Sequence, residues 1–249
     1  MNMLHRGLVL IIVVELLGSS VLVYRRLARV VPPVPDWSLI DPVTADDLRS
    51  AAAVCKSAQE WRTLGERYMT AGCFTESEMC HRVACEREPK NAVFRRQWAF
   101  ALERLGLLDE ANSQYQKTME LSAAETDSCR YFIGKNLLRE GKPSAARTYF
   151  EDGKKLPANL YELARLLRRA GELTEASSAY SLLAAAGPDM LQVNLLGYRL
   201  ALAQGDTARA KQLADRVRNS SRKLQNPFDE EAKRLFKATQ QFGANRDGT

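Results

Sequence analysis

The side chains best suited to chemistry in this sequence are five cysteines and two histidines. The cysteines are Cys55, Cys73, Cys80, Cys85 and Cys129, and the histidines are His5 and His81. An odd number of cysteines leaves at least one thiol free in a monomer. The motifs of thioredoxin-like enzymes and of covalent c-type haem attachment, C-x-x-C and C-x-x-C-H, do not occur. Without a nucleophile motif or a Gly-rich phosphate loop, we predict no catalytic residue and no cofactor.

His81 and Cys85 stand four residues apart, so a helix would place both on one face, where they could bind a metal ion. His81 also falls where later segments of the chain carry Tyr115, Phe150 and Tyr180, which indicates a core position. We therefore expect no metal site. A metal- or redox-linked role of Cys73, Cys80, His81 and Cys85 remains an alternative.

The overall charge is modest. The 249 residues carry a formal net charge of +6 and a pI near 9.1, and 45% of them are hydrophobic. Neither a run of Lys and Arg nor a strip of basic residues interleaved with aromatic ones occurs, which argues against nucleic-acid binding. The composition is that of a folded protein.

A regular series of glycines organises the chain. Gly72, Gly106, Gly141, Gly171 and Gly205 follow one another at spacings of 34, 35, 30 and 34 residues. Each glycine follows a run of helix formers and precedes another helical pattern, so each marks the turn of a helical hairpin. Hairpins repeated at this period stack into an array, because no single hairpin can bury its own apolar face.

The first copy carries a recognisable motif. Trp61, Leu64, Gly65 and Tyr68 have the spacing W-x-x-L-G-x-x-Y, followed by Ala84 and Pro89. This pattern resembles the tetratricopeptide repeat, and weaker copies extend the resemblance over residues 58–219. It implies an all-α fold, an α-solenoid of about five hairpins. Small residues such as Ala99 and Ala111 are expected where the helices of a hairpin approach closely.

The resemblance also implies a partner-binding groove lined by the first helix of each hairpin. Projecting the repeat register outward places mostly cationic and aromatic residues there. They are Arg62, Arg96, Phe100, Arg104, Tyr131, Lys135, Arg139, Tyr161, Arg165, Arg168, Arg169 and Arg199. Such a groove suits an acidic segment of a partner protein, held by charge-assisted arginine hydrogen bonds. A solvated basic face is the alternative. Chaperone-type members of the family hold a terminal carboxylate with asparagines. The matching groove positions of this chain carry Glu66, Phe100, Lys135 and Arg165 instead.

An apolar stretch precedes the array. Residues 7–24 contain a single charge, Glu15, and as a helix would span roughly 27 Å, enough for a membrane core. A cleaved signal peptide is the competing interpretation, but the length of the run and the basic flank favour a retained transmembrane anchor. Glu15 shares a helix face with Gly18 and Ser19, which predicts packing against another membrane helix. A solitary anchor with a protonated Glu15 is the alternative.

The side of the membrane on which the array lies is open to two arguments. Charge counting around the anchor favours the cytoplasm. The short amino tail and the Pro-rich stalk look like those of bacterial exported, membrane-anchored tetratricopeptide proteins. We expect a single-pass protein of the bacterial inner membrane with the array on the exported, periplasmic side.

The predicted organisation has four parts. Residues 1–29 form the anchor, 30–42 a Pro-rich spacer, 43–219 the array, and 220–249 a capping helix and a disordered tail. Capping boxes are predicted at Thr44 and Thr75, each followed three residues later by an acidic residue. The predicted function is a non-catalytic scaffold that binds other proteins, as an accessory subunit that assembles or stabilises a membrane complex. An accessory protein that binds an anionic envelope polysaccharide is an alternative.

Overall fold

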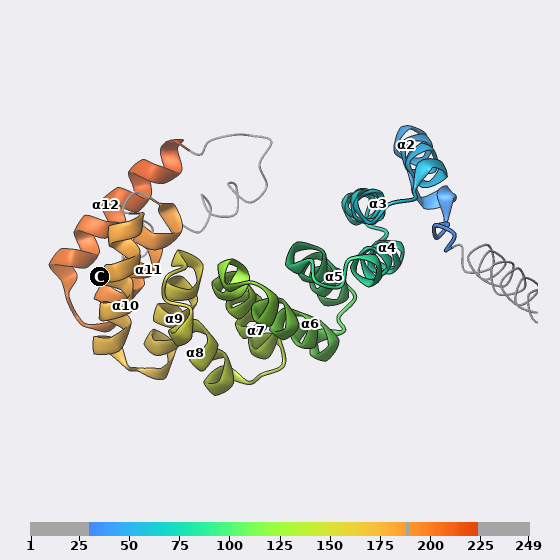
Figure 1. The fold of residues 1–249 in the computed structure, drawn as a ribbon. Coiled ribbons are helices and arrows are strands. Elements are labelled where there is room, and N and C mark those ends of the chain that lie inside the picture. The colour runs from blue at the N-terminus through green and yellow to red at the C-terminus, as the bar shows by residue number, and fades with distance from the viewer. Residues whose placement is uncertain (1–29, 188–189, 224–249) are drawn as a thin grey trace, which may run out of the picture. The chain divides into compact units, whose positions relative to one another are not determined.

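The computed structural model describes residues 30–187 and 190–223, and these residues fold into helices and connecting turns without a strand. The chain divides into two compact units at Cys80 and His81. The helix α4 (Phe74–Arg87) contains this boundary. The all-α class and the repeated hairpins predicted from the glycine series are confirmed (Figure 1).

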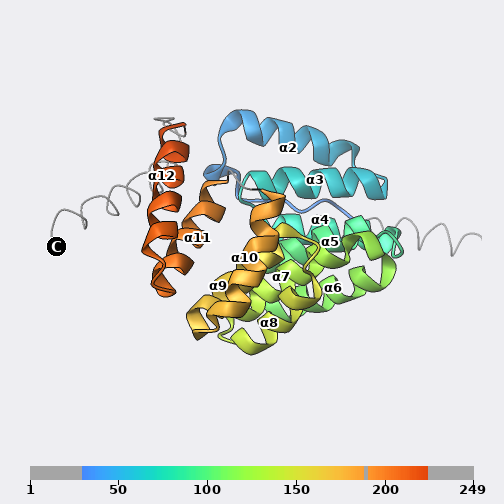
Figure 2. The same ribbon diagram turned by 90° about the vertical axis from the view of Figure 1, so that its left-hand side faces the viewer.

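The described part of the first unit contains a 3-10 turn, η1 (Trp37–Leu39), and the helices α2 (Pro42–Val54) and α3 (Ala58–Thr70). Figure 2 shows α2 running alongside α3, with which it is in contact. Arg67 on α3 forms an ion pair with Asp47 on α2 over 2.5 Å. The Ser77 hydroxyl donates a hydrogen bond of 2.8 Å to the Gly65 carbonyl, which ties the start of α4 to α3.

The helix starts in this unit differ from those predicted. Asp41, not Thr44, caps α2: its side chain accepts a hydrogen bond from the Thr44 amide, and Pro42 occupies the first turn, where its missing N–H costs nothing. Thr75 lies inside α4. The capping box instead stands at α3, where Ser57 and Glu60 each accept a hydrogen bond from the other's backbone amide.

The Pro-rich segment is docked on the first unit. The Tyr68 hydroxyl, on a fully buried side chain, donates a hydrogen bond of 2.7 Å to the Pro33 carbonyl. Pro35 is buried, and the Arg49 guanidinium lies 4.5 Å from the ring centre of Trp37. Residues 30–41 are therefore held against the helices that follow them.

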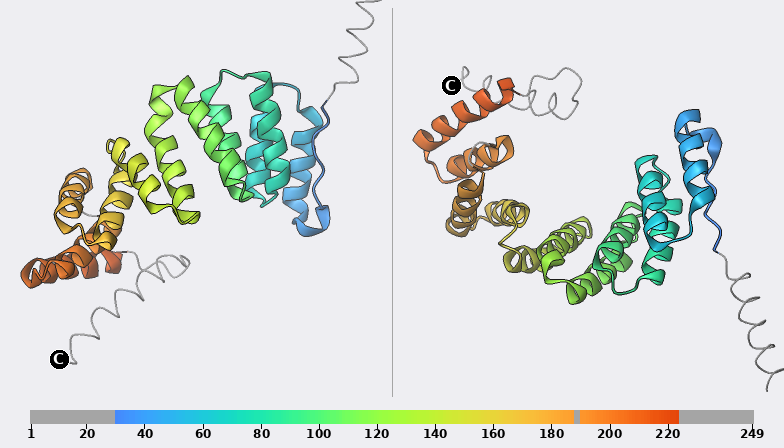
Figure 3. Two further views of the ribbon diagram at one scale, coloured as in Figure 1. Left: turned by 90° about the horizontal axis from the view of Figure 1, so that it is seen from below. Right: turned by 45° about the horizontal axis from the view of Figure 1, so that its top comes forward.

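The described part of the second unit consists of the end of α4 and four hairpins. The helices are α5 (Ala92–Arg104), α6 (Leu108–Leu121), α7 (Thr126–Arg139), α8 (Pro143–Asp152), α9 (Pro157–Ala170), α10 (Leu173–Ala186), α11 (Leu191–Ala203) and α12 (Thr207–Lys223), with a 3-10 turn, η2 (Ala123–Glu125), before α7. Each first helix packs on the second helix of its own hairpin, and each second helix on the next first helix. Figure 3 shows the hairpins from two further directions. Helix α12 extends past the predicted end of the array at residue 219.

The glycine series has a backbone cause. Gly72, Gly106, Gly141, Gly171 and Gly205 have φ between +73° and +82°, and no other described residue has a positive φ. Each lies just beyond the end of a first helix, where the left-handed conformation turns the chain back. A Cβ at these glycines would meet nothing within 4 Å, so conformation rather than space selects glycine.

The small and aromatic residues of the repeat form the core, as predicted. Ala99, Ala111 and Ala146 are fully buried, as are the aromatic side chains of Tyr115 and Phe150. His81, which occupies the corresponding position in the first hairpin, is also buried. The interpretation of His81 as a core residue is therefore confirmed.

The 30-residue spacing has a simple explanation. Helix α8 has 10 residues, whereas α6 and α10 have 14, so the third hairpin of the five lacks one helical turn. The buried Asn159 side chain closes the shortened connection by donating hydrogen bonds to the Asp127 and Gly153 carbonyls, over 3.0 and 2.9 Å.

Two predictions fall on residues that the structure does not describe. The anchor, residues 1–29 with Glu15, Gly18 and Ser19, and the capping helix and tail from residue 224 onward lie outside the described residues. None of the helices described in residues 30–223 combines the length and the apolar character needed to cross a bilayer.

Two glycines allow backbone conformation and packing to be separated. A Cβ at Gly134 would lie 2.5 Å from the Phe150 ring, whereas Gly141 has open space but a φ of +73°. We expect Gly134→Ala to cost about 1–3 kcal/mol through overpacking, and Gly141→Ala about 1–2 kcal/mol through backbone strain. Urea unfolding in a Phe150→Leu background should show a smaller cost for Gly134→Ala and an unchanged cost for Gly141→Ala. Equal costs in both backgrounds would contradict the packing role of Gly134.

Candidate protein-binding face

The first helices of the second unit present equivalent residues side by side. Phe100, Lys135, Arg165 and Arg199 each stand six residues before a left-handed glycine, on α5, α7, α9 and α11 respectively. Helix α9 contacts both α7 and α11. We call the partly exposed side chains on this side of the four helices the first-helix face. Eleven of the twelve predicted groove residues stand on these four helices. The twelfth, Arg62, belongs to the first unit and forms an ion pair with Glu66 over 2.6 Å.

A buried carboxylate neutralises one of the predicted groove cations. Glu103 on α5 has a side chain only 6% exposed, and it accepts a hydrogen bond from Arg139 on α7 over 2.7 Å. The Tyr115 hydroxyl donates to the same carboxylate over 3.2 Å. Burial, and then the negative charge of Glu103, raises the pKa of Tyr115, which keeps its hydroxyl protonated as a donor.

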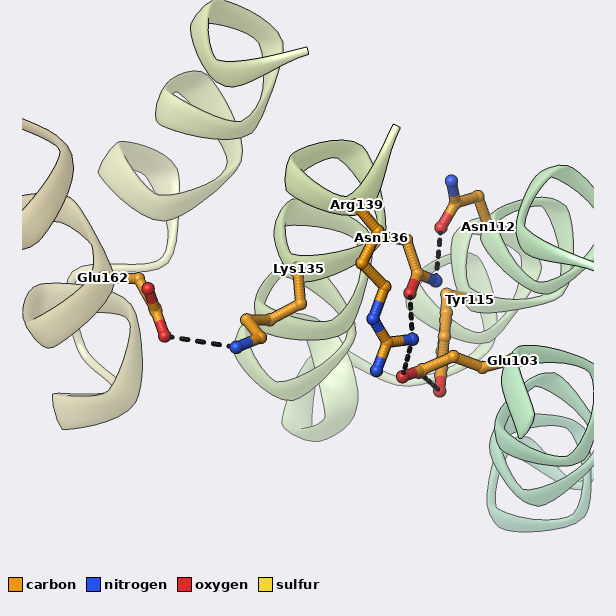
Figure 4. Close-up of polar contacts among 7 residues, drawn as sticks. All are labelled: Glu103, Asn112, Tyr115, Lys135, Asn136, Arg139 and Glu162. Carbon is orange, nitrogen blue, oxygen red and sulfur yellow. Dashed lines mark hydrogen bonds and ion pairs between the residues drawn. The ribbon is translucent and has the colours of Figure 1, made fainter. Parts of the chain in front are cut away.

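A second buried carboxylate lies one helix further along. Glu162 on α9, with a side chain 5% exposed, forms ion pairs over 3.4 Å with Lys135 on α7 and with Arg165 on its own helix. Figure 4 shows Lys135 and Arg139 leaving α7 in opposite directions, the first towards Glu162 and the second towards Glu103. Arg96 on α5 is likewise paired, with Glu125 over 3.0 Å.

Four arginines lie near one another on α9 and α11. Arg165, Arg168, Arg169 and Arg199 form what we call the arginine cluster. Within the described residues, Arg168, Arg169 and Arg199 make no ion pair, and the Arg168 Nε atom is buried without a hydrogen-bond partner. Burial, and then the positive charges of the other three members, lowers the pKa of the Arg168 guanidinium. The cluster is therefore a site of concentrated positive charge, in which Arg165 alone has an acidic partner among the described residues.

An aromatic group occupies the other end of the face. Phe132 on α7 stacks on Tyr115 at 5.2 Å between ring centres, and Phe100 and Tyr131 meet its ring edge-on at 6.1 and 5.4 Å. We call Phe100, Tyr131 and Phe132 the aromatic cluster. Phe100 is 36% exposed, which makes it one of the large apolar side chains that this face presents to solvent. Phe132 was not among the predicted groove residues.

Two further groove residues complete the comparison with the prediction. Tyr161, one turn before Arg165 on α9, is half-buried and packs against the core. Arg104 is exposed at the end of α5. Among the predicted residues of the second unit, the structure thus distinguishes paired cations, aromatic side chains and the arginine cluster.

Burial disfavours the reactive thiolate form of four of the five cysteines. Burial raises the pKa of Cys129 to about 12 and also raises the pKa values of Cys73, Cys80 and Cys85, so the thiols stay protonated at neutral pH. In the part of the chain that the structure describes, no three His, Cys, Asp or Glu side chains come together as a possible metal site.

Sequence reasoning missed the acidic partners of the groove cations. Glu103 and Glu162 stand on the same helices as the arginines and are directed into contacts between helices. Their signal was available: each lies close in the repeat register to positions that are apolar in other copies, Leu138 for Glu103 and Leu196 for Glu162. A charged residue at such a position indicates a partner on the neighbouring helix.

The pair of Glu103 and Arg139 predicts a characteristic stability pattern. Arg139→Ala leaves the buried Glu103 carboxylate without its cation, and because Arg139 is itself half-exposed we expect a loss of about 1–2 kcal/mol. Adding Glu103→Gln removes the uncompensated charge and should restore much of this loss. Chemical unfolding of the four proteins of this double-mutant cycle measures the coupling. Additive losses would show that the two side chains are not coupled.

Comparisons with known proteins bear on the fold. No protein-family model and no curated protein matches the sequence. Among solved structures, PilF of Pseudomonas aeruginosa matches with a TM-score of 0.62 and 22% identity over 82% of this chain and 90% of its own. The C-terminal part of a TPR repeat-containing protein from Cytophaga hutchinsonii matches with a TM-score of 0.62 and 16% identity, covering 82% and 85% of the two chains.

A third solved structure is that of YrrB, described as a TPR protein with an unusual peptide-binding site. It matches with a TM-score of 0.50 and 14% identity over 78% of this chain and 97% of its own. Identities this low establish the architecture alone. These structural matches, together with the W-x-x-L-G-x-x-Y motif and the left-handed glycines after the first helices, show that this chain has the tetratricopeptide-repeat fold.

Proposed function

We propose that this protein is a non-catalytic scaffold that binds an acidic segment of a partner protein through the first-helix face. The arginine cluster is the observation that carries the proposal. Lys135, Arg139 and Arg96 already have acidic partners within the chain, whereas Arg168, Arg169 and Arg199 have none among the described residues. The cluster is the part of the face with positive charge available to a ligand.

Carboxylates suit this site physically. Guanidinium groups bind carboxylates through paired hydrogen bonds that are shorter and stronger than neutral ones. An anion would also offset the mutual repulsion that, together with burial, lowers the pKa of Arg168. Peptide binding by a protein with this fold has a precedent in YrrB, a TPR protein with an unusual peptide-binding site.

The proposal includes attachment to a membrane. Residues 7–24 are apolar enough to form a single-pass anchor, and Glu15, Gly18 and Ser19 would share one face of that helix. A carboxylate within a membrane span, beside two small residues, would favour packing against another membrane helix. We infer that the protein is an accessory subunit of a bacterial inner-membrane complex, with its array on the periplasmic side.

Charge reversal tests the role of the arginine cluster. Arg169→Glu with Arg199→Glu should reduce partner capture about tenfold or more, which is the effect expected from losing two charge-assisted contacts. Capture should also lose most of its dependence on salt, because the charges responsible are gone. The measurement is quantitative mass spectrometry of proteins that co-purify with the full chain after gentle detergent extraction.

A matched control separates the cluster from net charge. Lys117→Glu with Lys211→Glu changes the net charge equally on exposed positions of the second helices α6 and α12. It should leave capture unchanged. If both double variants lose the same partners equally, the first-helix face is not the binding site. Competition by a polysaccharide polyanion, but not by acidic peptides, would instead support the envelope-polymer alternative.

A cysteine in an exposed loop tests the orientation. The native Cys73 is a poor reporter, because it is partly buried and burial raises its pKa. Lys154 is exposed in the turn after α8. A membrane-impermeant thiol reagent should label Lys154→Cys in intact spheroplasts, with the wild-type chain as the background. Labelling that requires lysis would place the array in the cytoplasm.

A further inference from the structure

We propose that the first-helix face binds a bipartite segment: one large apolar side chain held by the aromatic cluster, and a block of acidic residues held by the arginine cluster. This inference rests on the proposed function and adds to it the chemistry of the partner. It follows from the order in which the two clusters occur along the face.

The repeat register sets that order. The residues six before each left-handed glycine are, from α5 to α11, Phe100, Lys135, Arg165 and Arg199. One row of the face therefore changes from apolar to cationic along successive helices. In the middle of the row, Lys135 and Arg165 share the buried carboxylate of Glu162, so the positive charge of this stretch is partly compensated. A ligand lying along the row meets an apolar contact, then partly compensated cations, and then the arginines that have no acidic partner among the described residues.

The aromatic cluster is preorganised to receive an apolar side chain. Phe100 and Tyr131 both rest against the ring of Phe132, and Phe132 in turn stacks on Tyr115. Tyr115 is fully buried and its hydroxyl is held by Glu103. The exposed edge of Phe100 is thus supported from behind, and little conformational entropy is lost when a ligand covers it.

Helix packing sets the expected spacing. Neighbouring packed helices lie about 8–10 Å apart. The aromatic cluster spans α5 and α7, and the arginine cluster spans α9 and α11, so the nearest members are one helix apart and Phe100 is two helices from Arg165. An extended segment rises about 3.3 Å per residue, which places the apolar residue about three to six residues from the acidic block.

The same arrangement distinguishes a protein segment from a uniform polyanion. A polyanion with a uniformly repeating charge would place charged groups against the aromatic cluster as well as against the arginine cluster. A peptide can place one apolar side chain and several carboxylates at a chosen separation. The observations therefore favour a peptide whose apolar and acidic parts are separate.

Synthetic peptides test the proposal on the full chain in detergent micelles. The probe is a fluorescent peptide with one Trp, a Gly/Ser linker of about four residues, chosen from the spacing above, and a block of Glu. It is made in both chain directions. One control peptide replaces Trp by Ser, and another replaces the Glu block by Gln. Fluorescence anisotropy measures the dissociation constant over a range of salt concentrations.

The two clusters should respond differently to substitution. Phe100→Ser should weaken binding about fivefold, the effect of exposing part of an apolar contact, without altering the salt dependence. Arg169→Glu with Arg199→Glu should weaken binding more strongly and flatten the salt dependence. Leu182→Ser, at an exposed apolar position on the second helix α10, is the matched control for Phe100→Ser and should bind the peptide normally.

The outcomes separate this inference from the proposed function. If the Ser control peptide binds as tightly as the Trp peptide, and Phe100→Ser has no effect while charge reversal still does, the aromatic subsite is excluded and acidic recognition stands. If charge reversal has no effect, or none of the peptides binds, both proposals fail. If Phe100→Ser weakens binding of the Trp peptide but not of the Ser control peptide, direct contact between Phe100 and the Trp side chain is supported. A folding defect would weaken the binding of both peptides.

Discussion

The left-handed glycine after each first helix is the constraint on which the arrangement of this chain depends. A positive φ turns the chain back at the same point in every hairpin, and residues with a Cβ adopt that conformation at a cost of about 1–2 kcal/mol. Because the turn is fixed, residues at equal distances before it project from equivalent positions of successive helices. The alanines and aromatic side chains that pack the hairpins are thereby aligned, and so are the side chains of the first-helix face.

Within that alignment, buried carboxylates decide which cations can act. Glu103 and Glu162 stand between first helices, and each neutralises a cation that sequence register alone would assign to a binding surface. Such pairs hold neighbouring hairpins together, since removing the cation leaves a carboxylate with little access to water. At the corresponding positions of the repeat register, α9 carries Arg168 where α5 has Glu103, and α11 carries Leu196 where α9 has Glu162. The positive charge of the arginine cluster follows from that difference.

Much of the fold could be predicted from the sequence, because the repeat is visible in local features. The glycine spacing indicated five hairpins, and the small residues indicated where helices approach. Helix starts were less predictable. Thr44 and Thr75 have capping-box spacing, but Asp41 caps α2, and the capping box lies at Ser57, at the start of α3. Which residue caps a helix depends on where the preceding chain turns. The site was predicted as one set of twelve residues on one side of the array. Arg62 belongs to the first unit, however, and the other eleven residues belong to the second.

The division of that side into functional parts could not be predicted in the same way. An arginine has one identity in the sequence whether it is paired or not, and pairing is decided by side chains between 27 and 36 residues away, such as Glu162 for Lys135 and Glu103 for Arg139. Long-range pairing of this kind depends on the angle at which hairpins stack, which local patterns do not encode. Specificity in this array therefore arises between repeats. The residues that define it include the acids that remove binding capacity from part of the face, as well as the arginines and aromatic side chains that provide it elsewhere.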